Sequence, residues 1–152
     1  MTFSESVSGV NTADFTLTTT GVSGTSVSSV NQVTASQYTV AAATGSNSGT
    51  IRLDLTDDDT IADGAENKLG GTGAANGNYT SGEVYTIDKT APTVTINQAG
   101  AQADPASSFP ILYDVVFSEA VTGFTSADVT IGGTATGVSL TTSGSGTTYE
   151  IQ

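Results

Sequence analysis

Hydrophobic and polar residues alternate along most of the chain, which is the pattern of β-strands with one buried face. In Thr50–Leu55, every second residue is apolar, and we expect Arg52 and Asp54 between them to face water. Thr93–Asn97 alternates in the same way. No window of about 11 residues has apolar positions at helical spacing. The pattern therefore predicts an all-β protein.

One longer run is apolar on both faces. In Ile111–Ser118, Tyr113, Val115 and Phe117 fall on one face, while Leu112 and Val116 fall on the other. Such a run is typical of a central strand or of a strand at an interface. Shorter strands are predicted at Asp128–Ile131, Gly137–Thr141 and Thr148–Ile151, separated by glycine-rich turns.

The chain contains an internal duplication. Phe3–Leu17 and Phe117–Ile131 are identical at eight of 15 positions, at an offset of 114 residues. Further along, Gly21-Val-Ser matches Gly137-Val-Ser, and Tyr38 matches Tyr149. A module of about 100 residues has the size of a β-sandwich domain.

The two copies are not in frame with the ends of the chain. The first copy starts at Phe3, whereas the 25 residues Pro92–Val116 precede the equivalent point of the second. We therefore expect two incomplete repeats from a longer array. Residues 1–90 would form a repeat without its first strands, and residues 91–152 a repeat without its last strands.

Two motifs carry a family resemblance. Val116–Phe124 with Ala127–Ile131, and Tyr85–Ile96, resemble the bacterial immunoglobulin-like repeats of large type 1-secreted, RTX-like surface adhesins. The resemblance implies immunoglobulin-like Greek-key β-sandwich repeats in tandem. It also implies secretion to the bacterial cell surface, a role as stalk or spacer, and neighbouring repeats of the same polypeptide as partners.

The segment between the two copies has its own physical reading. Asp88–Pro92 spans at most about 17 Å when extended, so successive repeats are predicted to stack end to end. Pro92 fixes its own φ and pushes Ala91 toward extended backbone, which stiffens the joint.

Composition excludes several classes of function. Lys and Arg number 3 against 15 Asp and Glu, and a net charge of -12 repels both nucleic acid and anionic membranes. We therefore expect no nucleic-acid partner and no membrane insertion. The chain has no Cys and no His, which removes zinc and iron–sulfur sites and the usual activated nucleophiles. The sequence predicts a non-enzymatic protein.

Acidic residues concentrate in the segment Asp54–Asn67. Carboxylates about 4 Å apart repel one another, so a cluster must either splay into solvent or bind a cation. Calcium takes six to eight oxygen ligands and is the candidate cofactor. The candidate ligands in this segment are Asp57, Asp59, Asp63 and Glu66, and Asp88 is a further candidate at the joint. The alternatives are a solvated acidic loop and, for Asp88, a bond to nearby backbone or Lys89.

Other polar and aromatic residues leave alternatives open. Asp14 and Asp128 recur in both copies, as do Glu5 and Glu119, which favours turn capping or linker contacts over catalysis. The tyrosines are expected at the edge of the core, or else on a platform for sugar stacking: Tyr79, Tyr85, Tyr113 and Tyr149. The alternative functions are a module that binds a glycan or host protein, and an accessory domain of an extracellular polysaccharide-degrading enzyme.

Overall fold

The computed structural model describes all residues, 1–152. The chain is built of antiparallel strands and two three-residue 3-10 helices, so the prediction of an all-β protein is confirmed. It forms two compact units, Met1–Thr90 (unit 1) and Ala91–Gln152 (unit 2), each described here by itself. None of its helices has the length and apolarity needed to cross a membrane.

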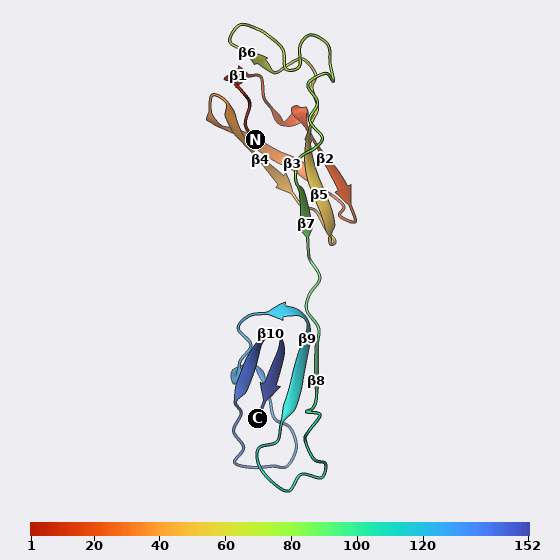
Figure 1. Cartoon of the computed structure of the whole chain (residues 1–152), viewed down its shortest axis with the longest axis vertical. Coiled ribbons are helices and arrows are strands. Elements are labelled where there is room, and N and C mark those ends of the chain that lie inside the picture. Colours follow the sequence, from red (N-terminus) through yellow and green to blue (C-terminus); the bar gives the residue numbers. More distant parts are fainter. The chain divides into compact units, whose positions relative to one another are not determined.

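Unit 1 contains a three-stranded sheet with the predicted strand at its centre. β5 (Gly49–Leu55) lies between β2 (Phe15–Thr20) and β7 (Val84–Ile87) (Figure 1). Leu17 is opposite Leu53 and Ile51 is opposite Tyr85, so these apolar side chains share one face of the sheet. Alternation of residues along β5 thus aims every second side chain at the core.

A second layer faces this sheet. β3 (Ser26–Thr34) pairs with β4 (Gln37–Ala43), and the short β1 (Val7–Ser8) pairs with β6 (Ala62–Asp63). The buried cluster contains one residue each from β2, β5 and the loop after β5: Phe15, Leu55 and Ile61. Valines of β3 and β4 pack against it, so the two layers bury their apolar faces against each other. Each fully buried apolar side chain contributes about 1.5–3 kcal/mol.

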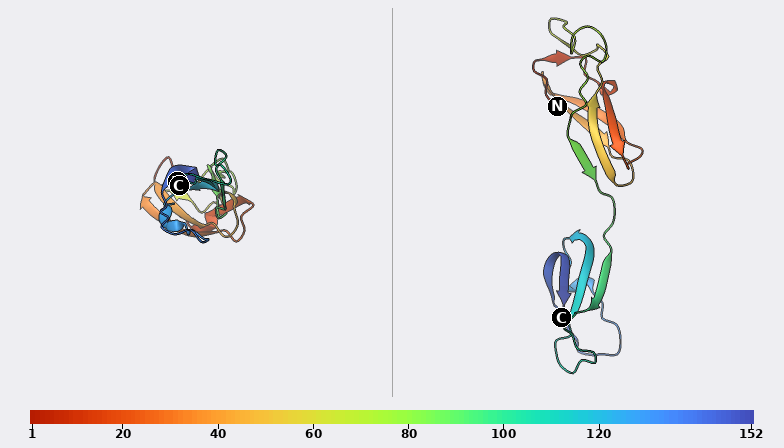
Figure 2. Two further views of the ribbon diagram at one scale, coloured as in Figure 1. Left: turned by 90° about the horizontal axis from the view of Figure 1, so that it is seen from below. Right: turned by 45° about the vertical axis from the view of Figure 1, so that its right-hand side comes forward.

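Unit 2 contains one three-stranded antiparallel sheet. β9 (Tyr113–Val121) lies between β8 (Val94–Gln98) and β10 (Thr142–Ile151) (Figures 1 and 2). β9 is therefore central within the sheet as predicted, but only the face of Val115 is buried, and Val116 on the opposite face is 42% exposed. Val115, Tyr149 and Ile151 form the buried core. Phe124 and Tyr149 pack edge to face, with ring centroids 5.0 Å apart.

Two predicted strands in unit 2 are wrong. Asp128 ends the 3-10 helix η2 (Ser126–Asp128), and Val129–Ile131 pairs with no other strand. Of Gly137–Thr141, only Thr141 is paired, through two backbone hydrogen bonds of 3.0 Å with Gln152. In unit 1 the segment equivalent to Val129–Ile131 is β2, which pairs with β5. Unit 2 has no strand in the place of β5, so the backbone there has no ladder to join.

The same aromatic contacts occur at equivalent positions of both units. The Tyr38 hydroxyl donates to Val7 O at 2.9 Å, and the Tyr149 hydroxyl donates to Val121 O at 3.1 Å. Tyr38 packs edge to face on Phe3 with ring centroids 5.8 Å apart. Tyr149 packs on Phe117 in the same way, also at 5.8 Å. Each tyrosine thereby fixes the duplicated segment of its unit, at Phe3 and Val7 or at Phe117 and Val121, against a later strand.

The same capped turn also occurs in both units. In unit 1 the Asp14 carboxylate accepts from the Asn11 N–H at 2.6 Å and closes the 3-10 helix η1 (Thr12–Asp14). In unit 2 Asp128 accepts from the Thr125 N–H at 2.9 Å and closes η2. The prediction that these two aspartates cap turns is therefore confirmed.

Candidate functional site

The acidic loop, residues 56–83, connects β5 to β7 and contains six of the 15 acidic side chains. It is held to the end of β5 by reciprocal backbone hydrogen bonds between Leu55 and Tyr79, at 2.9 and 3.0 Å. Leu69 and Ile61 are also bonded, N–H to O, at 3.0 Å. These backbone hydrogen bonds tie the irregular loop to the end of β5 and to itself, so the positions of its carboxylates are defined.

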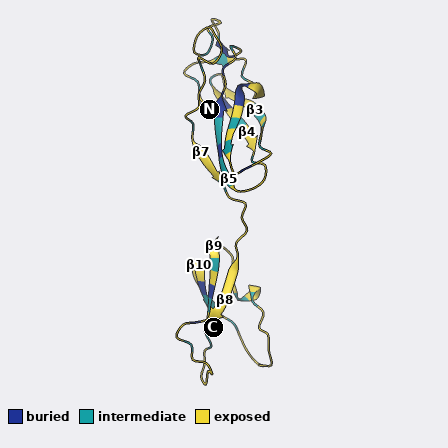
Figure 3. Cartoon of the chain, turned by 90° about the vertical axis from the view of Figure 1, so that its right-hand side faces the viewer, coloured by how far each residue is buried: buried dark blue, intermediate teal, exposed yellow.

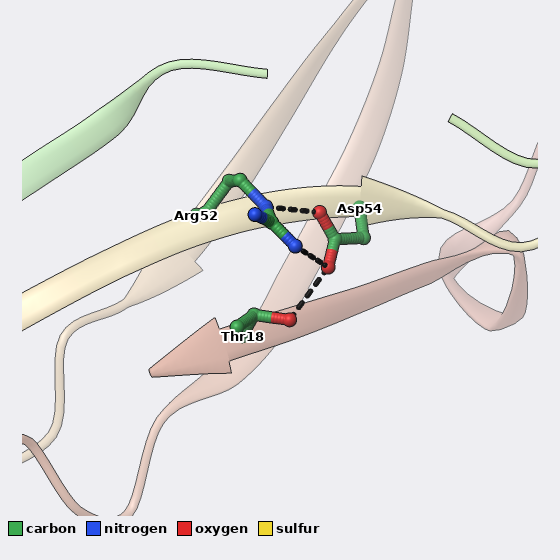
Figure 4. Close-up of polar contacts among 3 residues, drawn as sticks. All are labelled: Thr18, Arg52 and Asp54. Atoms are coloured by element: carbon green, nitrogen blue, oxygen red, sulfur yellow. Dashed lines mark hydrogen bonds and ion pairs between the residues drawn. The ribbon is translucent and has the colours of Figure 1, made fainter. Parts of the chain in front are cut away.

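The alternation predicted that Asp54, in β5 just before this loop, faces water, but the structure buries it. It is only 5% exposed. The Arg52 guanidinium makes a bidentate contact with its carboxylate, in which Nε donates to Oδ1 at 2.6 Å and Nη2 donates to Oδ2 at 3.0 Å (Figure 4). The Thr18 hydroxyl on the neighbouring strand donates to Oδ2 at 2.6 Å. Arg52 and Thr18 together hold the pKa of the Asp54 carboxyl below its usual range.

Asp57 is the most enclosed of the predicted calcium ligands, at 2% exposure. Its carboxylate accepts from the Asp59 N–H at 3.1 Å and from the Gly77 N–H at 3.0 Å. Its own N–H donates to the Asn78 side-chain oxygen at 2.7 Å. Asp57 therefore ties two parts of the acidic loop, about 20 residues apart in sequence, to each other.

Asp59 binds a distant part of the loop, whereas Asp58 binds within its own turn. Asp59 has a left-handed φ of 66°, and its carboxylate accepts from the Gly73 N–H at 2.9 Å. The Asp58 carboxylate accepts from the Thr60 hydroxyl and, at 3.0 Å, from the Thr60 N–H. These two bonds lower the pKa of Asp58.

Asp63 closes a tight turn further along the loop. Its Oδ1 accepts from the N–H groups of Ala65 and Asn67, both at 2.8 Å, and its Oδ2 accepts from the Asn67 amide at 2.8 Å. The Asn67 contacts come first among the causes that lower the pKa of Asp63. Glu66, in the same turn, has a left-handed φ of 68° and an exposed side chain.

The carboxylates of Asp57, Asp59 and Asp63 thus accept from backbone N–H groups. The structure does not bring the predicted calcium ligands together. Nowhere in the structure do three or more Asp, Glu, His or Cys side chains gather as a metal site requires. Calcium would need six to eight oxygens around one point. In this arrangement Asp63 stabilises its own turn, while Asp57 and Asp59 join distant parts of the loop. Calcium binding at Asp57, Asp59, Asp63, Glu66 or Asp88 stays a prediction.

The joint between the units is anchored on its unit 1 side by Ser48. The Ser48 hydroxyl donates to Asp88 Oδ1 at 3.2 Å and accepts from the Lys89 N–H at 2.9 Å. Asp88 also accepts from the Thr90 N–H at 2.9 Å. The Thr90 backbone and then Ser48 lower the pKa of Asp88. The bond from Asp88 to nearby backbone is the alternative that the sequence left open.

A matching anchor lies at the start of unit 2. The Thr93 N–H donates to the Ser118 hydroxyl, and the Ser118 N–H donates to Thr93 O, both at 2.9 Å. Only Ala91 and Pro92 lie between Thr90 and Thr93. Sequence reasoning missed both serine anchors, because Ser48 and Ser118 have no distinctive sequence context among many serines.

Unit 1 also has a large open groove of about 930 Å³. It is lined mainly by apolar side chains of β2, β4, β5 and β7 and of the N-terminal segment. Tyr79 and Tyr85 border it and are 56% and 60% exposed. Tyr113 is also exposed, at 42%. Of the four tyrosines expected at the edge of the core, only Tyr149 is therefore buried.

No protein-family model matches the chain, and no curated protein or solved structure matches it either. The function is therefore inferred from the residues of this chain and their contacts.

Proposed function

We propose that this chain is a spacer built of tandem immunoglobulin-like repeats, part of the stalk of a secreted bacterial surface adhesin. A spacer of this kind holds an adhesive domain away from the cell. Its chemistry is structural, and it needs many similar modules joined by short, well-anchored connections.

The recurrence of the same contacts in both units is the observation that carries this proposal. The tyrosine bonds of Tyr38 and Tyr149, and the turn caps of Asp14 and Asp128, lie at equivalent positions of the duplicated sequence. Contacts that recur in tandem are those that maintain a fold. A catalytic centre, by contrast, is needed only once.

The serine anchors on either side of Pro92 support the same proposal. Ser48 fixes Asp88, Lys89 and Thr90 to unit 1, and Ser118 fixes Thr93 to unit 2. The residues directly before and after the dipeptide Ala91-Pro92, Thr90 and Thr93, are therefore both held by hydrogen bonds. Proline restricts that dipeptide further, which suits a spacer whose modules must not collapse onto one another.

The charge of the chain suits a crowded surface array. A net charge of -12 gives neighbouring stalks a mutual repulsion and keeps them soluble. In this proposal calcium is a stabilising ion of the stalk, bound by the acidic loop or at Asp88, and its effect is measurable as a shift in unfolding temperature.

Single-molecule stretching of the chain from its two ends tests the spacer role. Modules in series should give two separate unfolding events, with length gains of about 300 Å for unit 1 and about 200 Å for unit 2 at ~3.6 Å per residue. A single event that spans the whole chain would contradict the proposal.

A glycan array with the same protein separates the spacer from a binding module. The spacer predicts no saturable binding. Saturable binding to a glycan that is lost in Tyr85→Ala, a substitution at an exposed side chain of the groove, would favour the binding module instead.

A further inference from the structure

The acidic loop contains an Asn-Gly dipeptide. Of the seven asparagines in the chain, only Asn76 is followed by glycine. In such a pair the backbone nitrogen of the glycine can attack Cγ of the asparagine side chain, and glycine hinders this attack least because it has no side chain of its own. Residues 70–81 are exposed except for the partly buried Gly77, so water reaches the dipeptide (Figure 3). Asn76 is therefore a position at which the chain can modify itself.

The fold requires glycine at position 77. A Cβ on Gly77 would lie 2.7 Å from Leu69 Cγ and 2.8 Å from Leu69 O, which is too close for either contact. A Cβ added to Gly70 would collide with the Gly77 nitrogen and with Asn76 Oδ1. The loop backbone is thus packed tightly against the peptide between Asn76 and Gly77. The same close packing that requires glycine creates the reactive pair.

The Asp57 carboxylate holds the nitrogen that would react. Its Oδ2 accepts from the Gly77 N–H at 3.0 Å, and the Asp57 carbonyl accepts from the Ala75 N–H at 2.9 Å. The attack on Asn76 requires that the Gly77 nitrogen first lose its proton. Beside a carboxylate that is only 2% exposed, a deprotonated nitrogen would bring two negative charges into contact. The hydrogen-bonded loop therefore resists the reaction, and the dipeptide reacts when this bond opens.

We propose that Asn76 is a site of spontaneous deamidation, and that opening of the hydrogen bond between Asp57 and Gly77 sets its rate. In the open loop the Gly77 nitrogen forms a bond to Asn76 Cγ. The Cγ–Nδ2 bond breaks, and Nδ2 leaves as ammonia with the proton that the Gly77 nitrogen gave up. Water then opens the cyclic imide at either carbonyl, which gives an aspartyl or an isoaspartyl residue. Water is the only co-reactant.

The product cannot restore the original loop. The imide nitrogen carries no proton, so Asp57 loses this donor while the imide is present. The isoaspartyl product inserts a methylene into the backbone beside Gly70, where a single Cβ already has no space. Either product adds a negative charge to a loop that carries six carboxylates. We expect the modified loop to be more open than the original. This inference goes beyond the spacer role and does not depend on it.

Mass spectrometry of the folded full chain, incubated near neutral pH, follows the replacement of NH₂ by OH at Asn76. A synthetic peptide of residues 72–80 is the reference without the Asp57 contact. The chain should react at least about tenfold more slowly than the peptide, because a hydrogen bond to a charged group biases opening by about that factor or more. Amide exchange at Gly77 removes the same proton, so the ratio of the two deamidation rates should equal the open fraction that exchange measures.

A matched pair of variants separates the Asp57 contact from the loop in general. Asp57→Ala removes the acceptor of the Gly77 N–H and should raise the rate at Asn76 at least about tenfold. Asp63→Ala removes a carboxylate of the same loop that binds Ala65 and Asn67 instead, and should react like the wild type. Amide exchange in β5 shows that each variant is folded.

A second variant serves if Asp57→Ala does not fold. Asp57→Asn keeps the size of the side chain and one acceptor oxygen but removes the charge, so it should raise the rate at Asn76 by a smaller factor than Asp57→Ala. The deamidated fraction, separated by its extra charge, should show faster amide exchange at Ala75 and Gly77 than the unmodified fraction.

Equal rates for the folded chain and the peptide would overturn the proposal. A folded Asp57 variant that reacts no faster than the wild type would overturn it as well, and so would equal rises in the Asp57 and Asp63 variants. Unchanged exchange in the deamidated fraction would contradict the opening of the loop.

Discussion

The capped turns at Asp14 and Asp128 give a matched pair of substitutions in one molecule. Asp14 is completely buried and accepts from the Asn11 N–H at 2.6 Å and the Thr60 hydroxyl at 3.2 Å. Asp128 is exposed and binds only the N–H and hydroxyl of Thr125, at 2.9 and 3.0 Å. Substitution of either residue by Ala removes the same cap, but only Asp14→Ala removes it from a fully buried position.

The expected losses differ for that reason. A lost cap costs about 0.5–2 kcal/mol, and a hydrogen bond shielded from water contributes more than an exposed one, so the buried cap is expected at the upper end of this range. Asp14→Ala should therefore destabilise unit 1 by about 2 kcal/mol, which lowers its Tm by about 10 °C. Asp128→Ala should destabilise unit 2 by about 1 kcal/mol, or about 5 °C in Tm.

Hydrogen exchange followed peptide by peptide during urea unfolding measures both units in the same sample. Asp14→Asn, which keeps one acceptor oxygen, should recover part of the loss. If Asp14→Ala costs no more than Asp128→Ala, burial of the cap does not determine its contribution, and the reasoning fails.

Three further predictions use the same assay. Gly9→Ala should destabilise unit 1 by several kcal/mol, and Gly123→Ala should destabilise unit 2 by about 1–2 kcal/mol. Both glycines have a left-handed φ, 88° and 83°, but only a Cβ at Gly9 would collide with Thr60 O. Equal losses would contradict the packing at Gly9. Unit 1 should lose stability as pH falls below about 4. A carboxyl whose folded pKa is lowered from 3.8 stabilises the fold above that value and ceases to do so as pH falls through the folded pKa; the carboxyls concerned are Asp54, Asp58, Asp63 and Asp88. An unchanged urea midpoint at pH 3 would refute this prediction. Calcium should raise the Tm of unit 1 by several degrees and a chelator should reverse this; a rise of the same size in NaCl of equal ionic strength would show screening and not binding.

The class of the fold and several of its strands follow from local sequence patterns alone. Period-two alternation identified β5, β8 and β9, because in a strand every second side chain meets the same layer. The duplication also identified Asp14 and Asp128 as caps, since a local turn motif depends on residues only three positions apart.

Which of these local patterns acquire partners depends on contacts between segments distant in sequence. Val129–Ile131 has strand-like alternation but no neighbouring strand, so it stays irregular, whereas the equivalent β2 has β5 beside it. Asp54 was expected in water and is buried, because Arg52 and Thr18 supply the charge and hydrogen bonds that a carboxylate needs away from solvent. Pairing across long sequence separations sets these outcomes, and no local pattern contains that information.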